Sequence, residues 1–382
     1  MQPSIGWIHL ISNPSAPLGA ESLGRVRATT ARTGDKVDPA RGFTALAQVV
    51  RESGLLERAR WFYVVLMIGL GLALLGAGVA FVVLGDSWWQ LVVAAVLGIL
   101  FTQFAFFSHE AAHRQVLSSG PANDRAGLVV GTLLVGMSYS WWMNKHTRHH
   151  ANPNQVGKDP DIAGRVVAFT EEKATNARGA LAIINKRQGW LFFPLLLLEG
   201  LNLYVQSYAW LLSPKNKVKS RVLELVLMTV RFAVVFGAAF WFLSPGLAVA
   251  FLAVSIGVFG FYMGAAFAPN HIGMPIIPAG AKLDFLTKQV LTSRNIRGGF
   301  WASVLYGGLN YQVEHHLFPS MARVHLARTR VIVREHCSTL DIPYTETSIR
   351  QAYAAVIEYL DRVGAFARDP FTCPVVGLYR RT

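Results

Sequence analysis

The chain has 382 residues, of which 52% are hydrophobic and only 15% are charged. This composition is too apolar for an ordinary soluble protein and predicts an integral membrane protein, while two cysteines, Cys337 and Cys373, are too few for a disulfide framework or a cysteine-rich zinc site. The formal net charge of +14 indicates contact with anionic lipid headgroups or acidic partners, and the lack of a basic stretch interleaved with aromatic residues argues against nucleic acid.

The N-terminal part leads into a predicted pair of membrane spans. Residues 1–42 carry several arginines among Gly, Ser, Pro and Thr, and we expect a flexible segment without a secretory signal. A short surface helix is predicted over 43–58. Residues 61–84 and 88–107 are each apolar for long enough to cross ~30 Å of hydrocarbon, so they predict a helical hairpin with a turn at 85–87.

Four further apolar stretches follow, and not all of them are expected to cross the membrane. Residues 126–143 are rich in Gly and Ser and end in two tryptophans, which favours a helix in the interface. The other three stretches are 190–212, 222–243 and 246–268.

The number of crossings follows from histidine motifs at 146–150 and 312–316. If both motifs serve one site, they lie on one side of the membrane and an even number of spans separates them. Four Lys and Arg residues at 215–221 follow the stretch 190–212, whereas the loop 244–245 carries no charge. The positive-inside rule therefore predicts that 190–212 lies in the interface and that both termini and every motif are cytoplasmic.

The predicted fold class is an all-α integral membrane protein with four transmembrane helices in two hairpins, interfacial helices and a cytoplasmic helical cap. The membrane domain is expected to cover 43–365, with the cap at 269–365 carrying the metal site and a tail at 366–382. Within the third span Arg231 is expected to snorkel to the surface, with Glu224 as a partner. Residues 322–363 predict two amphipathic helices separated by a break at 341–344.

Three motifs contain seven of the eleven histidines: HEAAH at 109–113, HTRHH at 146–150 and QVEHH at 312–316. Positions i, i+3 and i+4 of a helix share one face, so each motif directs its histidines together. Imidazole suits iron, copper, zinc and nickel, and seven ligands exceed the four of a structural zinc site. The pattern predicts two metal ions held by the histidines of all three motifs, which are His109, His113, His146, His149, His150, His315 and His316.

Neighbouring polar residues are expected to complete the site. His271 follows the fourth predicted span and emerges on the same side as the motifs, so it is a further candidate ligand. Asn270 and Gln312, the latter at the position of His146 in the second motif, are expected to be weak ligands or to shape the pocket. Metal-bound histidines usually donate their other N–H to an acceptor, and four carboxylates are candidates: Glu110, Asp159, Asp161 and Glu314.

The three motifs, their order and the hairpin spacing resemble the membrane fatty acyl desaturases over roughly residues 40–365. The stretches NYQVEHHLFP at 310–319 and HTRHHANPN at 146–154 look closest to actinobacterial acyl desaturases. The Gln of the third motif is also similar to that of front-end desaturases, which usually carry a fused cytochrome b5 domain with a haem motif that this sequence lacks.

The resemblance implies two iron ions, no haem bound by this chain, and no catalytic residue beyond the metal ligands. It implies that the site uses O2 and two external electrons to desaturate a long-chain acyl group linked to CoA, a carrier protein or a lipid. The electron donor would be a ferredoxin-type reductase or a cytochrome b5, and the location a bacterial plasma membrane. Zinc is expected to replace iron in some overexpressed samples.

Three alternatives remain open at this point. The same scaffold supports hydroxylases of alkanes or lipids. A membrane b-type cytochrome, an electron carrier, would place paired histidines in the middle of its spans. A metal transporter would need polar ligands within spans that are almost devoid of them.

Overall fold

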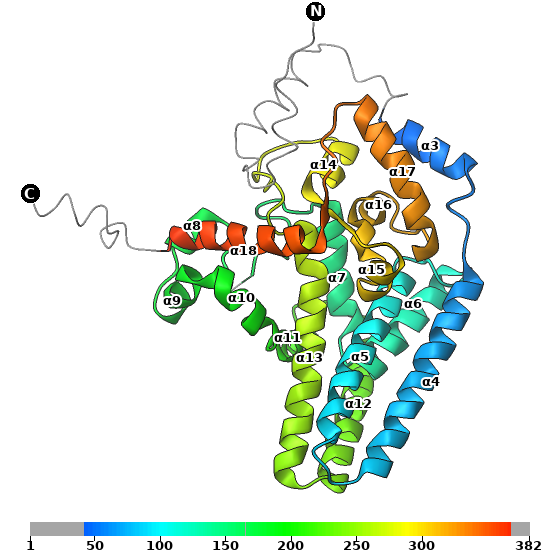
Figure 1. Ribbon diagram of the computed structural model, residues 1–382, viewed down its shortest axis with the longest axis vertical. Coiled ribbons are helices and arrows are strands. Elements are labelled where there is room, and N and C mark those ends of the chain that lie inside the picture. The colour runs from blue at the N-terminus through cyan, green and yellow to red at the C-terminus, as the bar shows by residue number, and fades with distance from the viewer. Residues whose placement is uncertain (1–41, 165, 368–382) are drawn as a thin grey trace, which may run out of the picture.

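The computed structural model describes residues 42–164 and 166–367, which form helices and one pair of short strands (Figure 1). The segment expected at 1–42 and the tail expected at 366–382 lie outside the described residues, except for residues 42, 366 and 367. Cys373 is also outside them.

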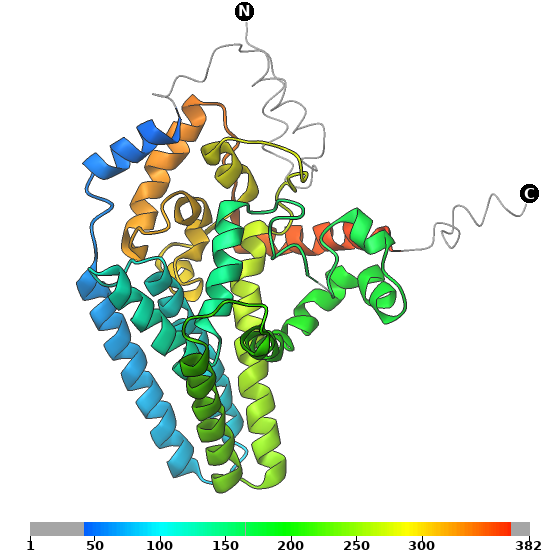
Figure 2. The ribbon, with the colours of Figure 1, turned by 180° about the vertical axis from the view of Figure 1, so that it is seen from behind.

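Four of the described helices are long and apolar enough to cross a membrane: α4 (Arg60–Leu84), α5 (Gln90–Ala112), α12 (Arg221–Phe242) and α13 (Pro245–His271). They contain 22 to 27 residues, which corresponds to about 33–40 Å of helix. Figures 1 and 2 show them side by side in one bundle. The all-α membrane architecture is therefore confirmed.

The bundle has a centre and a lipid-facing side. In the 18-residue apolar stretch of each long helix, 56% of the residues of α5 and 44% of those of α13 are buried, against 11% for α4 and 17% for α12. The helices α5 and α13 therefore form the centre of the bundle. The two hairpin loops meet at one end, where the Ser244 backbone N–H donates to Asp86 at 2.8 Å. Exposed tryptophans mark both ends: Trp88 and Trp241 beside these loops and Trp61 at the opposite end of α4. Such aromatics favour membrane interfaces.

Arg231 lies inside the protein, so its predicted snorkelling is wrong. Only 6% of the residue is exposed, and its guanidinium carbon lies 4.3 Å from the centroid of the Phe101 ring. Gly136 leaves space for it, because a Cβ there would come within 3.0 Å of the Arg231 side chain. Glu224 does not pair with Arg231 and accepts hydrogen bonds from Ser138 and Ser220 instead.

The stretch 126–143 is bent sharply in the structure. α6 (Gly120–Leu128) continues as the π-helix η2 (Val129–Val135), and after a break α7 (Tyr139–Ala151) leaves at 115°. Glu224 accepts from the Ser138 hydroxyl at 2.6 Å and from the Ser140 N–H at 3.2 Å. A negative charge at the first turn of a helix stabilises it, so Glu224 holds the start of the helix that carries the second histidine motif.

The stretch 190–212 also contains a break. α10 (Gln188–Leu196) includes Pro194 and is followed by α11 (Glu199–Leu212). Both views show α11 nearly end-on, across the direction of the four long helices (Figure 2). The interfacial placement of 126–143 and 190–212 stays a prediction.

α11 crosses α13 where two glycines face each other. A Cβ on Gly260 would lie 2.2 Å from the Gly200 nitrogen and 2.8 Å from the Leu196 carbonyl oxygen. Neither backbone group can move aside as a flexible side chain would. Small residues at such a crossing let two membrane helices approach closely.

We therefore expect Gly260→Ala to destabilise the fold by about 1–3 kcal/mol, the usual cost of overpacking. The measurement is the thermal unfolding midpoint of the purified protein in detergent. Gly237→Ala in α12 is the matched control, because a Cβ there would meet nothing within 4 Å. Equal midpoints for the two variants would contradict the close crossing.

The C-terminal cap covers one end of the bundle. Its elements are α14 (Phe285–Thr292), β1 (Asn295–Arg297), α15 (Gly299–Leu305), η3 (Leu309–Tyr311), α16 (Gln312–Leu317), α17 (Arg323–Thr339), β2 (Glu346–Ser348) and α18 (Ile349–Ala365). β1 and β2 pair in parallel. The short helices α3 (Phe43–Glu52), α8 (Glu171–Thr175) and α9 (Ala180–Lys186) lie at the periphery. Apolar residues of α3, α14 and α17 pack on Val313 and Leu317 of α16, and this core fixes the helix that carries the third motif.

Candidate metal centre

All eight candidate histidine ligands gather between the bundle and the cap. They form two groups, in each of which the ligand atoms lie within 4.8 Å of one another. The first group consists of His109, His113, His146, His150 and His315, and the second of His149, His271 and His316. A third group joins His149 to Asp159 and Asp161.

The helices explain this division. In α7, His146 and His150 are four residues apart and reach the first group, whereas His149 is turned to the second. In α16 the neighbours His315 and His316 diverge, one to each group. The second and third motifs therefore each supply both groups, so the two groups lie side by side rather than in separate sites.

The distances between ring nitrogens fit a shared ion. His113 Nε2 lies 2.8 Å and His109 Nε2 lies 3.1 Å from His146 Nε2. In the second group the Nε2 atoms of His149 and His271 are 3.3 Å apart. A metal–nitrogen bond of about 2.0–2.1 Å places neighbouring ligands about 2.8–3.4 Å apart in octahedral or tetrahedral geometry. The observed spacing matches that range.

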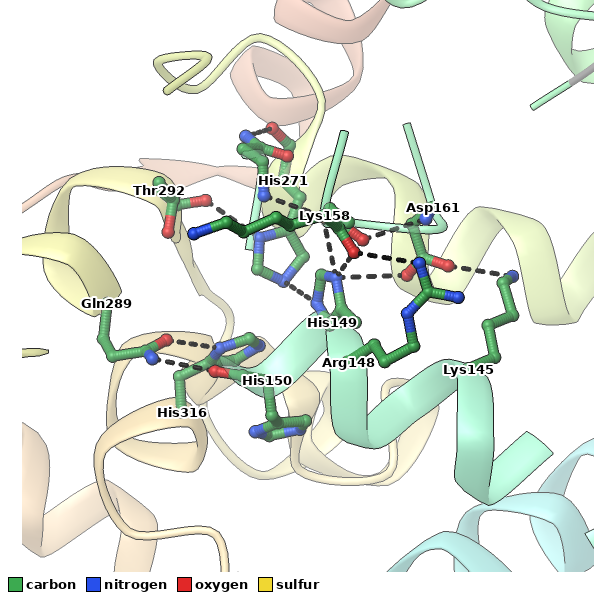
Figure 3. A network of polar contacts seen from close by, with 12 residues as sticks. Lys145, Arg148, His149, His150, Lys158, Asp161, His271, Gln289, Thr292 and His316 are labelled. Atoms are coloured by element: carbon green, nitrogen blue, oxygen red, sulfur yellow. Dashed lines mark hydrogen bonds and ion pairs between the residues drawn. The ribbon is translucent and has the colours of Figure 1, made fainter. Parts of the chain in front are cut away.

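The histidines of the second group are oriented by hydrogen bonds from their other ring nitrogen (Figure 3). His149 Nδ1 donates to Asp159 at 3.1 Å, His271 Nδ1 to the Thr292 carbonyl oxygen at 2.8 Å, and His316 Nδ1 to Gln289 Oε1 at 2.9 Å. Each Nε2 is left with its lone pair facing the group. His316 Nε2 is buried and has no hydrogen-bond partner among the residues that the structure describes, as expected of an atom that binds a metal ion.

The charge state of the rings also favours metal binding. Burial lowers the pKa of His150, His315 and His316 well below the ordinary value, so these rings are neutral and able to donate a lone pair. Burial acts in the same direction on His149, but Asp161 and Asp159 outweigh it and raise its pKa. The two carboxylates make this imidazole a more basic ligand.

The two candidate amides lie at the second group. The Gln312 amide nitrogen is 2.8 Å from His271 Nε2, and the Gln312 amide oxygen accepts from Asn270 at 3.3 Å. Asn270 is fully buried, and its own amide oxygen has no partner within 42–164 and 166–367. The structure thus places Gln312 against His271, and Asn270 against Gln312.

The four carboxylates divide into two pairs. Asp159 and Asp161 both contact His149 Nδ1. Glu110 instead binds Arg323, and the hydrogen bonds of Glu314 come from Asn295 and Tyr344. Within the described part of the chain neither Glu110 nor Glu314 bonds to a histidine ring, so these two carboxylates hold their helices in place rather than orient a ligand.

Several residues at the site have no signal in the sequence. Gln289 supports His316 and also donates to the His150 carbonyl oxygen at 2.9 Å, so it connects both groups. Arg323 anchors Glu110, and Tyr344 donates to Glu314, whose pKa is raised to about 7 by burial. All three come from segments outside the motifs, and only the folded chain brings them to the histidines.

Gln289→Met is expected to weaken metal binding about 10–100-fold, the usual cost of losing the partner of a ligating histidine. Methionine keeps the size of the side chain but removes the acceptor for His316. The measurement is metal content after titration with a chelator. The same substitution at the exposed Gln48 is the control, and an equal chelator sensitivity in both variants would argue against the role of Gln289.

A narrow apolar cleft opens beside the first group. Its wall includes His109 and Trp142 together with Ala105, Val135 and Met263, which come from α5, η2, α7 and α13. Of the eight candidate ligands only His109 lies in this wall, so the cleft touches the first group and not the second. The cleft has a free volume of about 20 Å³, so an acyl chain would have to displace side chains along this wall to reach His109.

Comparison with known proteins agrees with this arrangement. The family described as "Fatty acid desaturase" matches residues 86–348. The Delta(8)-fatty-acid desaturase of Helianthus annuus is 27% identical over 354 residues, which cover 87% of this chain and 75% of that protein. The Delta(6)-fatty-acid desaturase fat-3 of Caenorhabditis elegans is 29% identical, over 83% of this chain and 74% of its own.

Proposed function

The chain belongs to the fatty acid desaturase family, and from this premise we propose that it introduces a cis double bond into a long-chain acyl group at a histidine-held pair of iron ions. The observation that carries the proposal is the convergence of eight histidines in two adjoining groups beside an apolar cleft. The first group and the second would each hold one ion, with Gln312 and Asn270 completing the pocket of the second.

The reaction balances as an oxidation of the acyl chain by dioxygen. A pair of methylene groups loses two hydrogen atoms, and O2 takes up these together with two electrons and two protons to give two molecules of water. The bound iron ions would supply the activation of O2 that an unactivated C–H bond requires. The two electrons come from an external donor.

The residues of this chain provide binding, orientation and exclusion of water. The acyl chain would lie against His109 once the side chains of the cleft wall move apart, and the Trp142 ring stacks on the His146 ring at 4.2 Å between centroids. Asp159, Thr292 and Gln289 fix the rings of the second group. His109 and His315 are buried, which limits the access of bulk water to that side of the first group.

Topology and substrate class are part of the proposal. The positive charges near the motifs support a cytoplasmic site with both termini on that side. The acyl chain would be linked to CoA, a carrier protein or a lipid. Named relatives are described as Delta(8), Delta(6) and Delta(5) desaturases, which supports a double bond introduced near the carboxyl end.

The deciding experiment supplies membranes containing the protein with isotope-labelled acyl substrates, O2 and a reductant, followed by mass spectrometry. The expected product has two hydrogens fewer than the substrate, and fragmentation locates the double bond. A product with one added oxygen would instead establish a hydroxylase. A haem absorption band in the purified protein would support the electron-carrier alternative.

A further inference from the structure

The short helix α15 has an exposed apolar face, although it belongs to the cap. Ala302 on its other side is buried in one apolar cluster with Phe106 of α5 and Ala266 of α13. Four large side chains point outward, and we call them the α15 face: Phe300, Trp301, Val304 and Leu305, which are 72%, 73%, 37% and 52% exposed. An apolar surface of this kind marks a contact with a membrane or another protein.

Two hydrogen bonds fix the position of α15 along the membrane helices. Tyr262 of α13 donates to the Leu305 carbonyl oxygen at 2.6 Å, and Gln103 of α5 donates to the Val304 carbonyl oxygen at 3.2 Å. Tyr262 lies 17 residues, or about 26 Å, beyond Pro245 at the far end of α13. Since the hydrocarbon core is about 30 Å thick, the last turn of α15 lies at its edge. Figures 1 and 2 show α15 at the height of the cap-side end of α4.

The carbonyl groups at the end of α15 are bonded within the protein. Tyr306 and Gly308 donate their backbone N–H groups to the carbonyl oxygens of Ala302 and Ser303, each at 2.8 Å. The next two carbonyl oxygens accept from the side chains of α5 and α13. The last four carbonyl groups of a helix have no partner within the helix, and at an exposed end water can satisfy them. Here protein groups satisfy all four, as a hydrocarbon environment requires.

Positive charge lies beside the start of α15. Arg297 is exposed and pairs in β1 with Ser348 of β2, so Arg350 in the first turn of α18 is close to it. Arg350 shares the helix face of Tyr353, whose hydroxyl donates to the Ala265 carbonyl oxygen of α13 at 3.1 Å. Neither arginine forms an ion pair with a residue that the structure describes. Both guanidinium groups are therefore available to an anionic partner.

We propose that the α15 face inserts into the bilayer leaflet on the cap side, and that Arg297 and Arg350 bind the phosphate groups of anionic phospholipids there. Aromatic and aliphatic side chains next to arginines are typical of a segment that lies in the headgroup region. The inference assigns to the membrane a part of the cap that the sequence alone predicts to be cytoplasmic. Only residues 306–311 separate α15 from α16, so the contact ties the third histidine motif to the membrane surface.

The position of the α15 face favours lipid over a second copy of this chain. It continues the lipid-facing surface of α13, where Phe261 next to Tyr262 is 40% exposed. Four partly exposed side chains also offer far less area than the about 800 Å² per partner that a stable protein interface buries. A bilayer needs no such minimum, because the spanning helices already hold the protein in it.

The test determines whether a label on the α15 face is in lipid or in water. Val304→Cys carries a bimane fluorophore, and every variant also has Cys337→Ala and Cys373→Ser so that the label has one site. Val79→Cys in α4 and Val331→Cys in α17 are matched controls for lipid and for water, because these valines are 54% and 50% exposed. The full-length protein is placed in nanodiscs of phosphatidylcholine and phosphatidylglycerol, and quenching by brominated acyl chains is compared with quenching by aqueous iodide.

Brominated lipid is expected to quench the label at position 304 about as strongly as the label at position 79, and iodide to quench it at least about fivefold less than the label at position 331. Quenching at position 304 by iodide alone would overturn the proposal. Protection from both quenchers would also overturn it, in favour of a second copy of the chain. Leu305→Cys, at the next exposed position, replaces Val304→Cys if that variant unfolds at a lower temperature.

Charge reversal tests the role of the two arginines. In Arg297→Glu/Arg350→Glu, labelled at position 304, the preference for brominated phosphatidylglycerol over brominated phosphatidylcholine should fall about fivefold or more. Arg328→Glu/Arg334→Glu changes the net charge equally at exposed positions of α17 and should leave the preference unaltered. An equal preference in both double variants would refute the binding of anionic lipid. No measurement requires turnover, so the result is independent of the proposed desaturase function.

Discussion

Replacing His149 with alanine is expected to abolish product formation while the protein remains folded and inserted in the membrane. His149 is the only one of the three second-group histidines that comes from α7, and its ring is also held by Asp159 and Asp161. Removing the ligand itself should cost more than the about 10–100-fold that loss of an outer partner costs. The measurements are alkene formation and metal content per chain, and we expect the ion of the second group to be lost.

His325→Ala is the control for this experiment. His325 lies in α17 outside both histidine groups, so its variant should keep activity and metal content. Alkene formation by His149→Ala at the unsubstituted rate would refute the role of His149. Loss of the folded protein would be recognised by an altered thermal unfolding midpoint, and His149→Gln would then test the ligand with less disturbance.

Arg323→Met is expected to lower the free energy of unfolding by about 3–5 kcal/mol, because it leaves the buried charge of Glu110 unpaired. Arg323 donates two hydrogen bonds to Glu110, at 2.6 and 2.7 Å, and the two residues are only 6% and 2% exposed. The pair joins α5 to α17 next to His109. The measurement is the unfolding midpoint in detergent, which should fall by many degrees.

Two further variants isolate the ion pair. Arg330→Met breaks the more exposed pair with Glu346 and should cost no more than about 1 kcal/mol. The double variant Glu110→Gln/Arg323→Met removes both buried charges and should recover part of the lost stability, since a buried pair often contributes little beyond neutralising itself. A double variant less stable than Arg323→Met would show that the unpaired charge is not the main cost.

Local patterns in the sequence were sufficient for much of the fold. The apolar stretches 61–84, 222–243 and 246–268 coincide closely with α4, α12 and α13. Hydrophobicity and length are properties of a segment alone, so a span can be predicted without its neighbours. The break at 341–344 between α17 and α18 was predicted for the same reason, because it interrupts a helical period.

Buried charges were predicted less well. Arg231 was expected at the membrane surface beside Glu224, yet it lies against Phe101 next to Gly136. Glu110 was expected to support a histidine, yet its partner Arg323 is 213 residues away in the chain. A buried charged side chain interacts with whichever group the fold places beside it. The spacing of residues along the sequence does not reveal a partner that comes from another helix.

The sequence by itself determined that this protein is helical, embedded in a membrane and rich in clustered histidines, because each of these properties can be recognised within a single segment of the chain. Only the tertiary structure decided that the eight histidines divide into groups of five and three, and that Gln289 and Thr292 orient two of the rings. These features depend on contacts between helices that are distant in the chain. Such contacts form when the helices pack together, and the spacing of residues within one helix does not predict them.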